Sequence, residues 1–333
     1  MPDFGKRATD AEMKRIRPKI YAIYKQAYRE IEQKGKDFVA AHLRREAELK
    51  KQVEDGKMSV ADFNAWKQGQ IFQGKQWAAR KQQMADTLYN ADKVAQQIVN
   101  DSRFDVFAAN ANYIGYSLEH DASINTGFGL YDANSVKRLV KQEPDLLPPK
   151  KNVGKNASYR WYNRQIQSAV TQGIIQGEGI GDIAKRIGQQ TGEANLNVML
   201  RNARTMCNGA QNAGRIEGLH QAERLGVKVK KQWVCTLDNR TRDAHADLDG
   251  QIRDIDEPFE NELGEIMYPG DPSADPANVW NCRCSIVYVH PEYPSEMQRR
   301  DGDGEIIGNM TYKEWKALKT GSEAEPENRK RGR

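Results

Sequence analysis

The chain has 333 residues, of which 38% are hydrophobic and 29% are charged, and its formal net charge is +5. A chain of this length can bury a sizeable core and form two domains. Its mean hydropathy of −0.83 indicates either long helices that expose much of their surface or burial against partner subunits. Because no stretch of 18 consecutive apolar residues occurs, we expect no membrane-spanning helix.

The sequence also bears on the compartment in which the protein is made. Residues 1–18 lack the apolar segment of a signal peptide. Four cysteines are too few for a disulfide scaffold. We therefore expect a chain made in a reducing cytoplasm.

Charge is distributed unevenly along the chain. Residues 240–333 carry 13 Lys and Arg against 20 Asp and Glu, whereas the remainder carries 38 against 26. A solvated helical surface would account for this excess. The alternative is contact of the first two-thirds of the chain with nucleic acid or an acidic partner, and charge alone does not decide between the two.

Two long helices are predicted at the start of the chain. Apolar residues at a spacing of three to four, from Ile16 to Phe38, predict helix over residues 10–55, and the main helix is expected to start with Pro18 in its first turn. Ser59 is expected to cap a second helix that continues to about residue 100. Two such helices joined by a short turn predict an antiparallel hairpin.

Shorter helices and a linker follow. Residues 101–120 are predicted to be helical, and Asn134 or Ser135 to cap a short helix. The proline-rich stretch "EPDLLPPKKNVGKN" is typical of a linker. Helices are then expected over residues 157–176, 181–190 and 194–225. The glycines of "QGEGIGD" follow a helix rather than a strand, so we interpret them as a helix end and turn.

From Val227 the periodicity changes to that of strands. "VKVKKQWVC", "QIRDIDEPF" and "CSIVYVH" are predicted strands, and "TRDAHADL" one or two helical turns that end with Gly250 at positive φ. The predicted fold is α+β, with an N-terminal helical hairpin or bundle, a helical lead-in and a small C-terminal α+β domain. Five segments are predicted. They are a partner-contacting helical domain (1–143), a linker (144–156), the helical lead-in (157–226), the α+β domain (227–292), and a short helix with a disordered charged tail (293–333).

Residues 235–250, "CTLDNRTRDAHADLDG", and 281–289, "NCRCSIVYV", hold three of the four cysteines and one of the five histidines. Cys282 and Cys284 lie on one face of an extended chain, so they could give two thiolates to one zinc ion, with Cys235 and His245 as further ligands. Asp247 and Asp249 are other candidate ligands. Alternatively, both thiols are small buried side chains at the start of a strand.

The same residues allow two metal-free interpretations. His245 could act as a general base beside Asp247 or Asp249, or activate a cysteine. Alternatively, a polar clasp could hold the small domain together, since arginines pair bidentately with carboxylates. The candidate clasp residues are Trp233, Asp238, Arg240, Arg242, His245, Asp249, Gly250, Asn281 and Arg283.

Several blocks in a fixed order carry a resemblance to a known family. They are "WVCTLDNRTRDAHADLDG", "PF", "YPGDP" and "NCRC", preceded by "RNART" and "NAGR" in the lead-in. Over residues 155–290 the chain resembles the bacteriophage Mu protein F-like minor head proteins, the head-morphogenesis family of tailed phages. Cys235 stands where that family has a small or hydroxyl residue. The positions that match the family motif are Trp233, Asp238, Arg240, Thr241, Arg242, His245, Leu248, Asp249, Gly250, Asn281, Cys282, Arg283 and Cys284.

The resemblance implies a virion protein that sits inside the head near the portal and is present in the host cytoplasm during assembly. It implies roles in head morphogenesis, DNA packaging or genome ejection. Expected partners are the portal protein, the major capsid or scaffold protein, and double-stranded DNA bound without sequence preference; no membrane partner is expected. Some relatives carry a toxin or ADP-ribosyltransferase domain, but the stretch after Pro291 is short for one. We therefore expect no enzyme and no cofactor other than the zinc considered above.

Two other functions stay open at this point. A metal-dependent nuclease would use His245 with Asp238, Asp247 and Asp249, although Arg240 and Arg242 would neutralise such a site. A DNA-binding protein without catalysis would show an affinity that falls steeply with salt.

Overall fold

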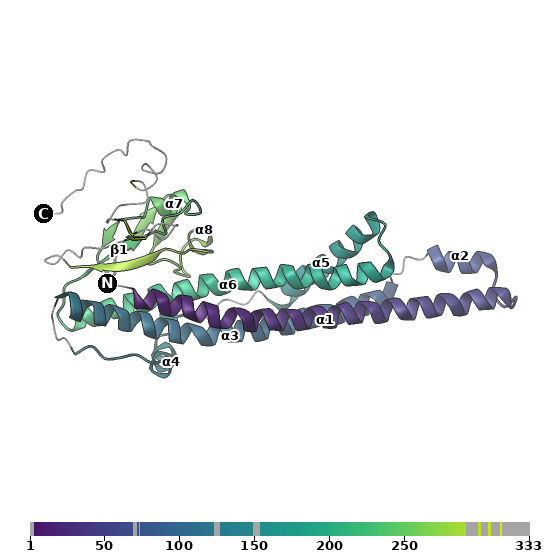
Figure 1. Ribbon diagram of the computed structural model, residues 1–333, viewed down its shortest axis with the longest axis horizontal. Coiled ribbons are helices and arrows are strands. Elements are labelled where there is room, and N and C mark those ends of the chain that lie inside the picture. Colours follow the sequence, from purple (N-terminus) through teal and green to yellow (C-terminus); the bar gives the residue numbers. More distant parts are fainter. Residues whose placement is uncertain are drawn as a thin grey trace. The chain divides into compact units, whose positions relative to one another are not determined.

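The computed structural model describes residues 3–68, 72, 74–122, 127–148, 154–290, 299–300, 306–307 and 314. Long helices precede a few short antiparallel strands, so the predicted α+β class is confirmed. The helices in Figure 1 are α1 (Phe4–Glu54), α2 (Val60–Gln68), α3 (Gly74–Ala122), α4 (Ala133–Gln142), the 3-10 turn η1 (Pro144–Leu146), α5 (Lys155–Ile175), α6 (Ile180–Arg224), α7 (Asp243–Ala246) and α8 (Pro276–Val279). The strands are β1 (Lys230–Val234), β2 (Ile252–Arg253), β3 (Phe259–Asn261), β4 (Gly264–Ile266), β5 (Ser285–Val289), β6 (Arg299–Arg300) and β7 (Ile306–Ile307). Within the described part of the chain, no helix is both long and apolar enough to cross a membrane.

Helix α1 starts earlier than its apolar pattern predicts. Asp3 caps it, because the Asp3 Oδ1 accepts a hydrogen bond of 2.7 Å from the Lys6 amide. Pro18 therefore lies in the helix interior rather than in the first turn. The proline cannot donate to the carbonyl four residues earlier, but it lies on the exposed side of the helix, where water can satisfy that carbonyl.

Other helix boundaries also differ from the sequence predictions. Ser59 does cap the next helix, since its Oγ accepts from the Asp62 amide at 3.0 Å. That helix, α2, ends at Gln68, well before the predicted end near residue 100, and α3 then continues through residues 101–120, which are helical as predicted. The cap of α4 is Asp132, in a reciprocal capping box with Ser135, rather than Asn134 or Ser135 itself.

The two helices predicted over residues 181–190 and 194–225 are one helix, α6. The expected break contains Thr191 and Gly192, which are poor helix formers. Packing overrides that preference: a Cβ on Gly192 would lie 3.2 Å from the Cβ of Tyr28, so the absent side chain lets α6 pass close to α1. Thr191 also bonds back to the Ile187 carbonyl at 2.6 Å.

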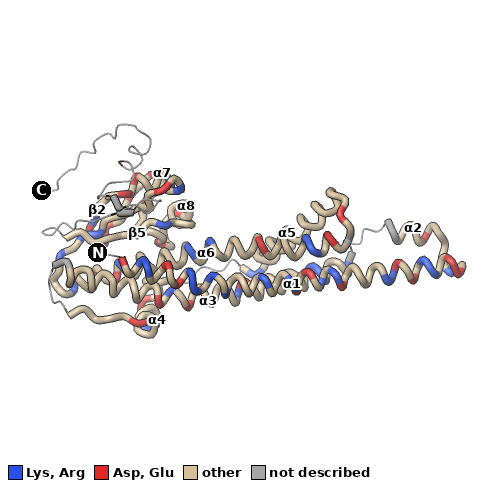
Figure 2. Tube along the Cα trace, in the orientation of Figure 1, with Lys and Arg blue, Asp and Glu red and all other residues tan. Residues whose placement is uncertain are grey.

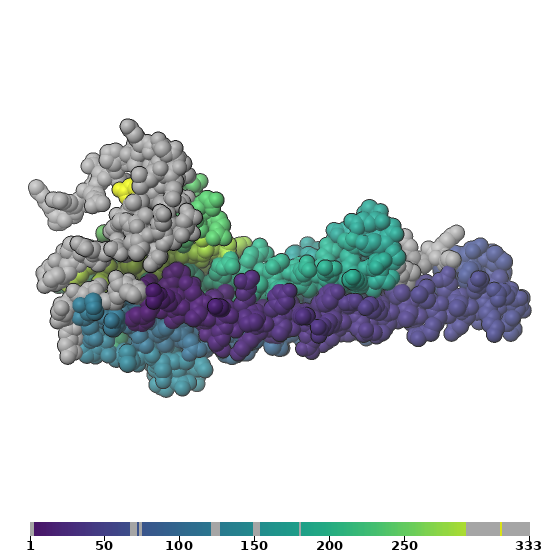
Figure 3. All heavy atoms as spheres, in the orientation of Figure 1, coloured from purple at the N-terminus to yellow at the C-terminus, as the bar shows by residue number. Residues whose placement is uncertain are grey.

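The chain forms two compact units, each assembled from separate segments. The helical unit comprises Arg15–Ile98 and Lys150–Leu200. In it α1 and α3 form the predicted antiparallel hairpin, because Tyr24 bonds Asp92 whereas Phe38, further along α1, contacts Trp77. Tyr162 of α5 donates to the same Asp92 carboxylate. Figure 3 shows the α1 surface, purple to blue, against the teal surface of α5 and α6.

The second unit, the sheet unit, comprises Met1–Lys14, Val99–Pro149 and Arg201–Arg333. Its three-stranded antiparallel sheet has the order β2-β1-β5, with Trp233 opposite Ile286 and Lys231 opposite Tyr288. These four side chains are buried, whereas their neighbours along each strand are more exposed. The alternation predicted for β1 is therefore confirmed. The segment of β5, which is predicted as a buried strand, alternates in the same way, so one face of the sheet turns inward.

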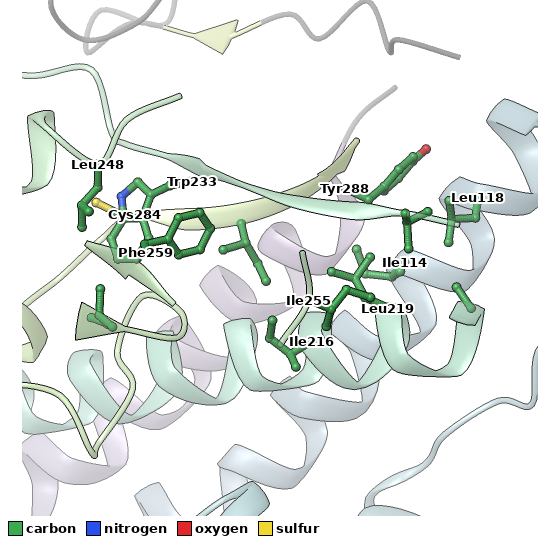
Figure 4. Packing of buried hydrophobic residues seen from close by; sticks show 14 of the residues in the cluster. Ile114, Leu118, Ile216, Leu219, Trp233, Leu248, Ile255, Phe259, Cys284 and Tyr288 are labelled. Carbon is green, nitrogen blue, oxygen red and sulfur yellow. The ribbon is translucent and has the colours of Figure 1, made fainter. Parts of the chain in front are cut away.

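The inward face of the sheet shares one apolar core with two helices. Figure 4 shows side chains of β1 and β5 above Ile114 and Leu118 of α3 and Ile216 and Leu219 of α6. Close helix contact is achieved at Gly214 of α6, where an added Cβ would lie 2.3 Å from the Phe107 carbonyl oxygen of α3.

The segment "QIRDIDEPF", predicted as one strand, forms two short strands, β2 and β3. A turn separates them, closed by the Glu257 amide donating to the Asp254 carbonyl at 3.1 Å, and it buries Ile255 in the core. The division into five segments at residues 143, 156, 226 and 292 stays a prediction. Residues 149–153 and most of 293–333, including the expected charged tail, lie outside the described residues.

Candidate functional site

Four candidate ligand side chains come together at one end of the sheet in the sheet unit. Cys235 follows β1 directly, and Cys284 precedes β5 directly; because Val234 pairs with Ser285, the two cysteines become neighbours. His245 is carried by the single turn of α7, and Cys282 follows α8. All four residues are at most 4% exposed.

The His245 ring lies against two thiols. Its Nδ1 is 3.3 Å from Cys284 Sγ and 3.6 Å from Cys282 Sγ. Its Nε2 is 3.0 Å from the Asn278 carbonyl oxygen. A carbonyl oxygen only accepts hydrogen bonds, so Nε2 carries the proton and the Nδ1 lone pair faces the two sulfurs.

Cys235 joins the cluster from the other side. Its thiol donates to the His245 carbonyl oxygen at 2.9 Å, and its Sγ lies 3.5 Å from Cys284 Sγ. Its amide donates to Asp249 Oδ1 at 2.7 Å. The Trp233 ring meets the His245 ring edge-on, with centroids 5.9 Å apart.

The environment keeps the two paired thiols protonated in the absence of a cation. Hydrogen bonding to Cys284, followed by burial, raises the pKa of Cys282 well above its ordinary value. The pKa of Cys284 is also raised, mainly by its contact with Cys235. Thiolates are the reactive form of cysteine, so these two thiols are poor nucleophiles as they stand.

An ion-pair cluster lies beside the thiols. Arg283 Nη2 donates to Asp238 Oδ1 at 2.7 Å, and its Nη1 bonds the other carboxylate oxygen. The Arg240 amide donates to the same Oδ1 at 3.0 Å. The hydrogen bonds from Arg283 hold the pKa of the Asp238 carboxyl well below its usual range. Arg242 donates instead to the carbonyl oxygens of Ala277 and Trp280, at the end of α8.

The remaining predicted residues fix the backbone around the cluster. Gly250 adopts a φ of +85°, as its position after α7 predicts, and its amide donates to the Trp233 carbonyl at 2.9 Å. Asn281 adopts a φ of +57°, and its Oδ1 accepts from Arg204 of α6 at 2.8 Å. Asp247 is exposed, whereas the group arranged to hold a metal ion, His245, Cys282 and Cys284, is buried.

Two buried polar residues of α6 hold β5, the strand that directly follows Cys284. The Asn212 side chain accepts from the Ile286 amide at 3.0 Å and donates to the Pro269 carbonyl at 3.0 Å. The fully buried Arg215 donates to the Ile286 carbonyl at 2.8 Å and forms an ion pair with Asp3. Neither residue is among the site residues predicted from the sequence, although both lie in the quoted "NAGR" block, which was the available signal.

Asn261 and Asn278 were also missed. Their side-chain amides form a reciprocal pair, at 2.9 and 3.1 Å. Asn278 is completely buried, and its backbone carbonyl is the acceptor for His245. A buried asparagine cannot be distinguished from an exposed one in a loop sequence, so no local pattern marks this pair.

Comparison with known proteins gives matches of phage origin. Residues 164–287 match the family described as "Phage Mu protein F like protein". The minor head protein GP7 of Bacillus phage SPP1 is 32% identical over 216 residues, which cover 63% of this chain and 69% of that protein.

Other relatives share a smaller part of their length. The NAD(+)–arginine ADP-ribosyltransferase EFV of Enterococcus faecalis is 29% identical over 221 residues, which cover 63% of this chain but 42% of that protein. An uncharacterized protein of Haemophilus influenzae is 30% identical over 130 residues, covering 38% of this chain and 25% of that protein. No solved structure matches the chain significantly.

Proposed function

The chain belongs to the phage Mu protein F-like family of bacteriophage head proteins, and from this premise we propose that it acts beside the portal during head assembly, without catalysis. In this role the helical unit contacts the portal, capsid or scaffold protein. The sheet unit provides a rigid module whose backbone is fixed by the buried cluster. A contribution to DNA packaging or delivery is part of the same proposal.

The extent of the similarity to the SPP1 minor head protein carries this proposal. The match covers 63% of the chain. Residues 164–333 make up only about half of it, so the match must extend to residues before 164. The similarity therefore includes helices that precede the family's own segment. If the two proteins had only the fold of the small domain in common, their similarity would be confined to that domain. Similarity that extends into other helices is expected when the two proteins also make the same contacts with partners.

The geometry of the site favours a structural role over the nuclease alternative. Asp238 is held by Arg283, and Asp249 accepts from a backbone amide, so both carboxylates already have partners. Among the described residues, the group arranged to hold a metal ion contains His245 and two cysteines and no carboxylate. Carboxylate oxygens are the ligands expected for Mg²⁺ or Mn²⁺ in a nuclease, so this cluster gives that mechanism no support.

Counting the protein in purified heads tests the proposal. We expect a few copies per procapsid by quantitative mass spectrometry, and chemical cross-links from lysines of α1 to the portal protein. The major capsid protein in the same sample calibrates the count. Absence from procapsids and virions, or a copy number equal to that of the major capsid protein, would contradict a portal-proximal role.

A basic face on α1 supports the DNA-related part of the proposal. Between Glu12 and Glu30 the helix has six Lys and Arg and no acidic residue, and all six are exposed; Figure 2 marks the basic residues in blue. At 100° per residue, Lys19, Lys25 and Arg29 fall within roughly 120° of the helix circumference, opposite the buried stripe of Ile20 and Tyr24. Such a face can neutralise backbone phosphates without reading bases.

Replacing Lys19, Lys25 and Arg29 by Glu is expected to weaken binding to double-stranded DNA and to flatten its salt dependence. If each residue contacts one phosphate, the slope of log K against log salt falls by about 3. The measurement is a fluorescence-anisotropy titration at several salt concentrations. The control replaces the exposed Arg44, Lys50 and Lys51 of the same helix by Glu, which makes an identical charge change. Equal loss of slope in both variants would show that net charge, rather than this face, governs binding.

A further inference from the structure

The buried cluster of His245, Cys282, Cys284 and Cys235 has the composition and spacing of a zinc site. We propose that it binds one Zn²⁺ ion through His245 Nδ1 and the Sγ atoms of Cys282, Cys284 and Cys235. Thiolate and imidazole are the ligands that zinc prefers in closed structural sites. This inference is independent of the proposed role in head assembly, because it depends on the geometry of the sheet unit alone.

The spacing of the donor atoms agrees with tetrahedral coordination. Zn–S bonds of about 2.3 Å and Zn–N bonds of about 2.0–2.1 Å place tetrahedral S and N ligands about 3.6 Å apart, and two S ligands about 3.8 Å apart. The two distances from His245 Nδ1 to sulfur are 3.3 and 3.6 Å, and Cys284 and Cys235 are 3.5 Å apart. The donor atoms of His245, Cys282 and Cys284 all lie within 4.8 Å of one another.

The surroundings of His245 are those of a metal-binding histidine. Its Nε2 proton is directed to the Asn278 carbonyl at 3.0 Å, which fixes the ring and leaves the Nδ1 lone pair for an ion. Asn278 is in turn fixed by its amide pair with Asn261. The amide of Cys284 points at Cys282 Sγ, at 3.4 Å, and can donate to a bound thiolate.

Binding requires a small rearrangement of Cys235. Its thiol now donates to the His245 carbonyl, so the sulfur must turn from that oxygen toward the ion. When three Zn–S bonds form, three thiol protons are released to water and the imidazole stays neutral. The group whose donor atoms all lie within 4.8 Å of one another contains His245, Cys282 and Cys284 but not Cys235. These three residues are therefore the preformed part of the proposed site.

The test uses the whole protein, expressed with zinc in the medium and purified under reducing conditions without chelators. Elemental analysis is expected to give about one zinc per chain. X-ray absorption of the same sample is expected to give three sulfur ligands and one nitrogen ligand. Fewer than about 0.2 zinc per chain, with no uptake and no rise in Tm when Zn²⁺ is added to the reduced protein, would overturn the proposal. A Cys235–Cys284 disulfide in the freshly purified protein would also overturn it.

Variants locate the ion. Cys282→Ser is expected to lose the zinc and to abolish the fall in Tm that a strong chelator causes in the wild type. The matched control is Cys207→Ser, because Cys207 is the remaining buried free cysteine and lies on α6, outside the cluster; it should keep one zinc per chain. Cys235→Ser should weaken zinc binding while leaving the Cys282 and Cys284 bonds intact. Unchanged affinity in this variant would remove Cys235 from the ligand set. If Cys282→Ser fails to fold, the number of sulfur ligands that X-ray absorption gives for the wild-type protein tests the proposal instead.

Discussion

At the scale of the residue, Lys231 is a buried cation that destabilises the core of the sheet unit. This strand residue is completely buried, and its ammonium donates to the Met267 carbonyl at 2.9 Å and lies 5.0 Å from the centre of the Phe259 ring. Burial lowers its pKa to about 8, against the favourable charges of Asp256 and Asp271. Burying a cation with one neutral acceptor destabilises the folded state whenever the lysine is charged.

The stability of the protein should therefore increase with pH through the window set by Lys231. Between pH 8 and about 10.4 the folded state has lost this proton and the unfolded state retains it, so raising the pH favours folding. Relative to Lys231→Met, the wild type should gain about 2–3 kcal/mol in the free energy of unfolding across this window. Urea denaturation at a series of pH values measures the difference. Lys228→Met, at an exposed neighbouring position, should leave the pH dependence of the wild type unchanged.

At the scale of the element, helix α6 depends on glycines at its crossing with α3. Gly214 lets the backbones of the two helices approach, and Gly218 lies against Ile114 and the Ala111 carbonyl in the same way. Two backbones that are this close cannot yield to a new methyl group as a flexible side chain would. Their separation must increase instead, and the packing of the adjacent core is then lost.

Gly214→Ala is therefore expected to destabilise the protein by about 3 kcal/mol, although alanine is the better helix former. The control is Gly181→Ala in the same helix, where the added Cβ would meet nothing within 4 Å beyond its chain neighbours and the adjacent backbone of its own helix. That change should be neutral or stabilise by up to about 1 kcal/mol. Thermal and urea unfolding of the two variants gives both values. A Gly214→Ala variant as stable as the wild type would mean that the helices do not cross this closely.

At the scale of the whole molecule, α1, α3 and α6 each contribute to both units, and each unit has a buried apolar cluster of its own among the described residues. Leu88 is completely buried in the helical unit, and Leu219 in the sheet unit. Truncation of either side chain removes apolar contacts from one core, at a cost of about 2–5 kcal/mol. The helices and strands that lose these contacts should then unfold locally more often.

Hydrogen exchange measured by mass spectrometry should then separate the two units. Leu88→Ala is expected to raise exchange in α5 and residues 75–98, and to leave β1 and β5 protected as in the wild type. Leu219→Ala should have the reverse effect, so each variant is the control for the other. An equal rise across both units in either variant would instead mean that the shared helices make the protein unfold as one cooperative body.

Local patterns were sufficient to predict most elements but not where the helices end. Apolar spacing predicted α1 and its hairpin with α3, alternation predicted β1, and the apolar segment "CSIVYVH" predicted β5 as a buried strand. The continuity of α6 could not be predicted, because Thr191 and Gly192 disfavour a helix locally, and only contact with Tyr28 makes the small side chain an advantage. Residue preferences describe a segment in isolation, whereas a helix end is decided by what the segment packs against.

The sequence by itself determined the family of this protein and indicated the candidate ligands of its site. The order of the motif blocks indicated the family, and the one-residue spacing of Cys282 and Cys284 placed both thiols on one face. Only the tertiary structure decided that Cys235 lies beside Cys284, that Asp249 binds a backbone amide, and that Nδ1 of His245 faces the sulfurs. These contacts join residues far apart in the chain, through the β1–β5 register and the placement of α7. No local pattern encodes such distances, since they arise when the sheet and its loops pack together.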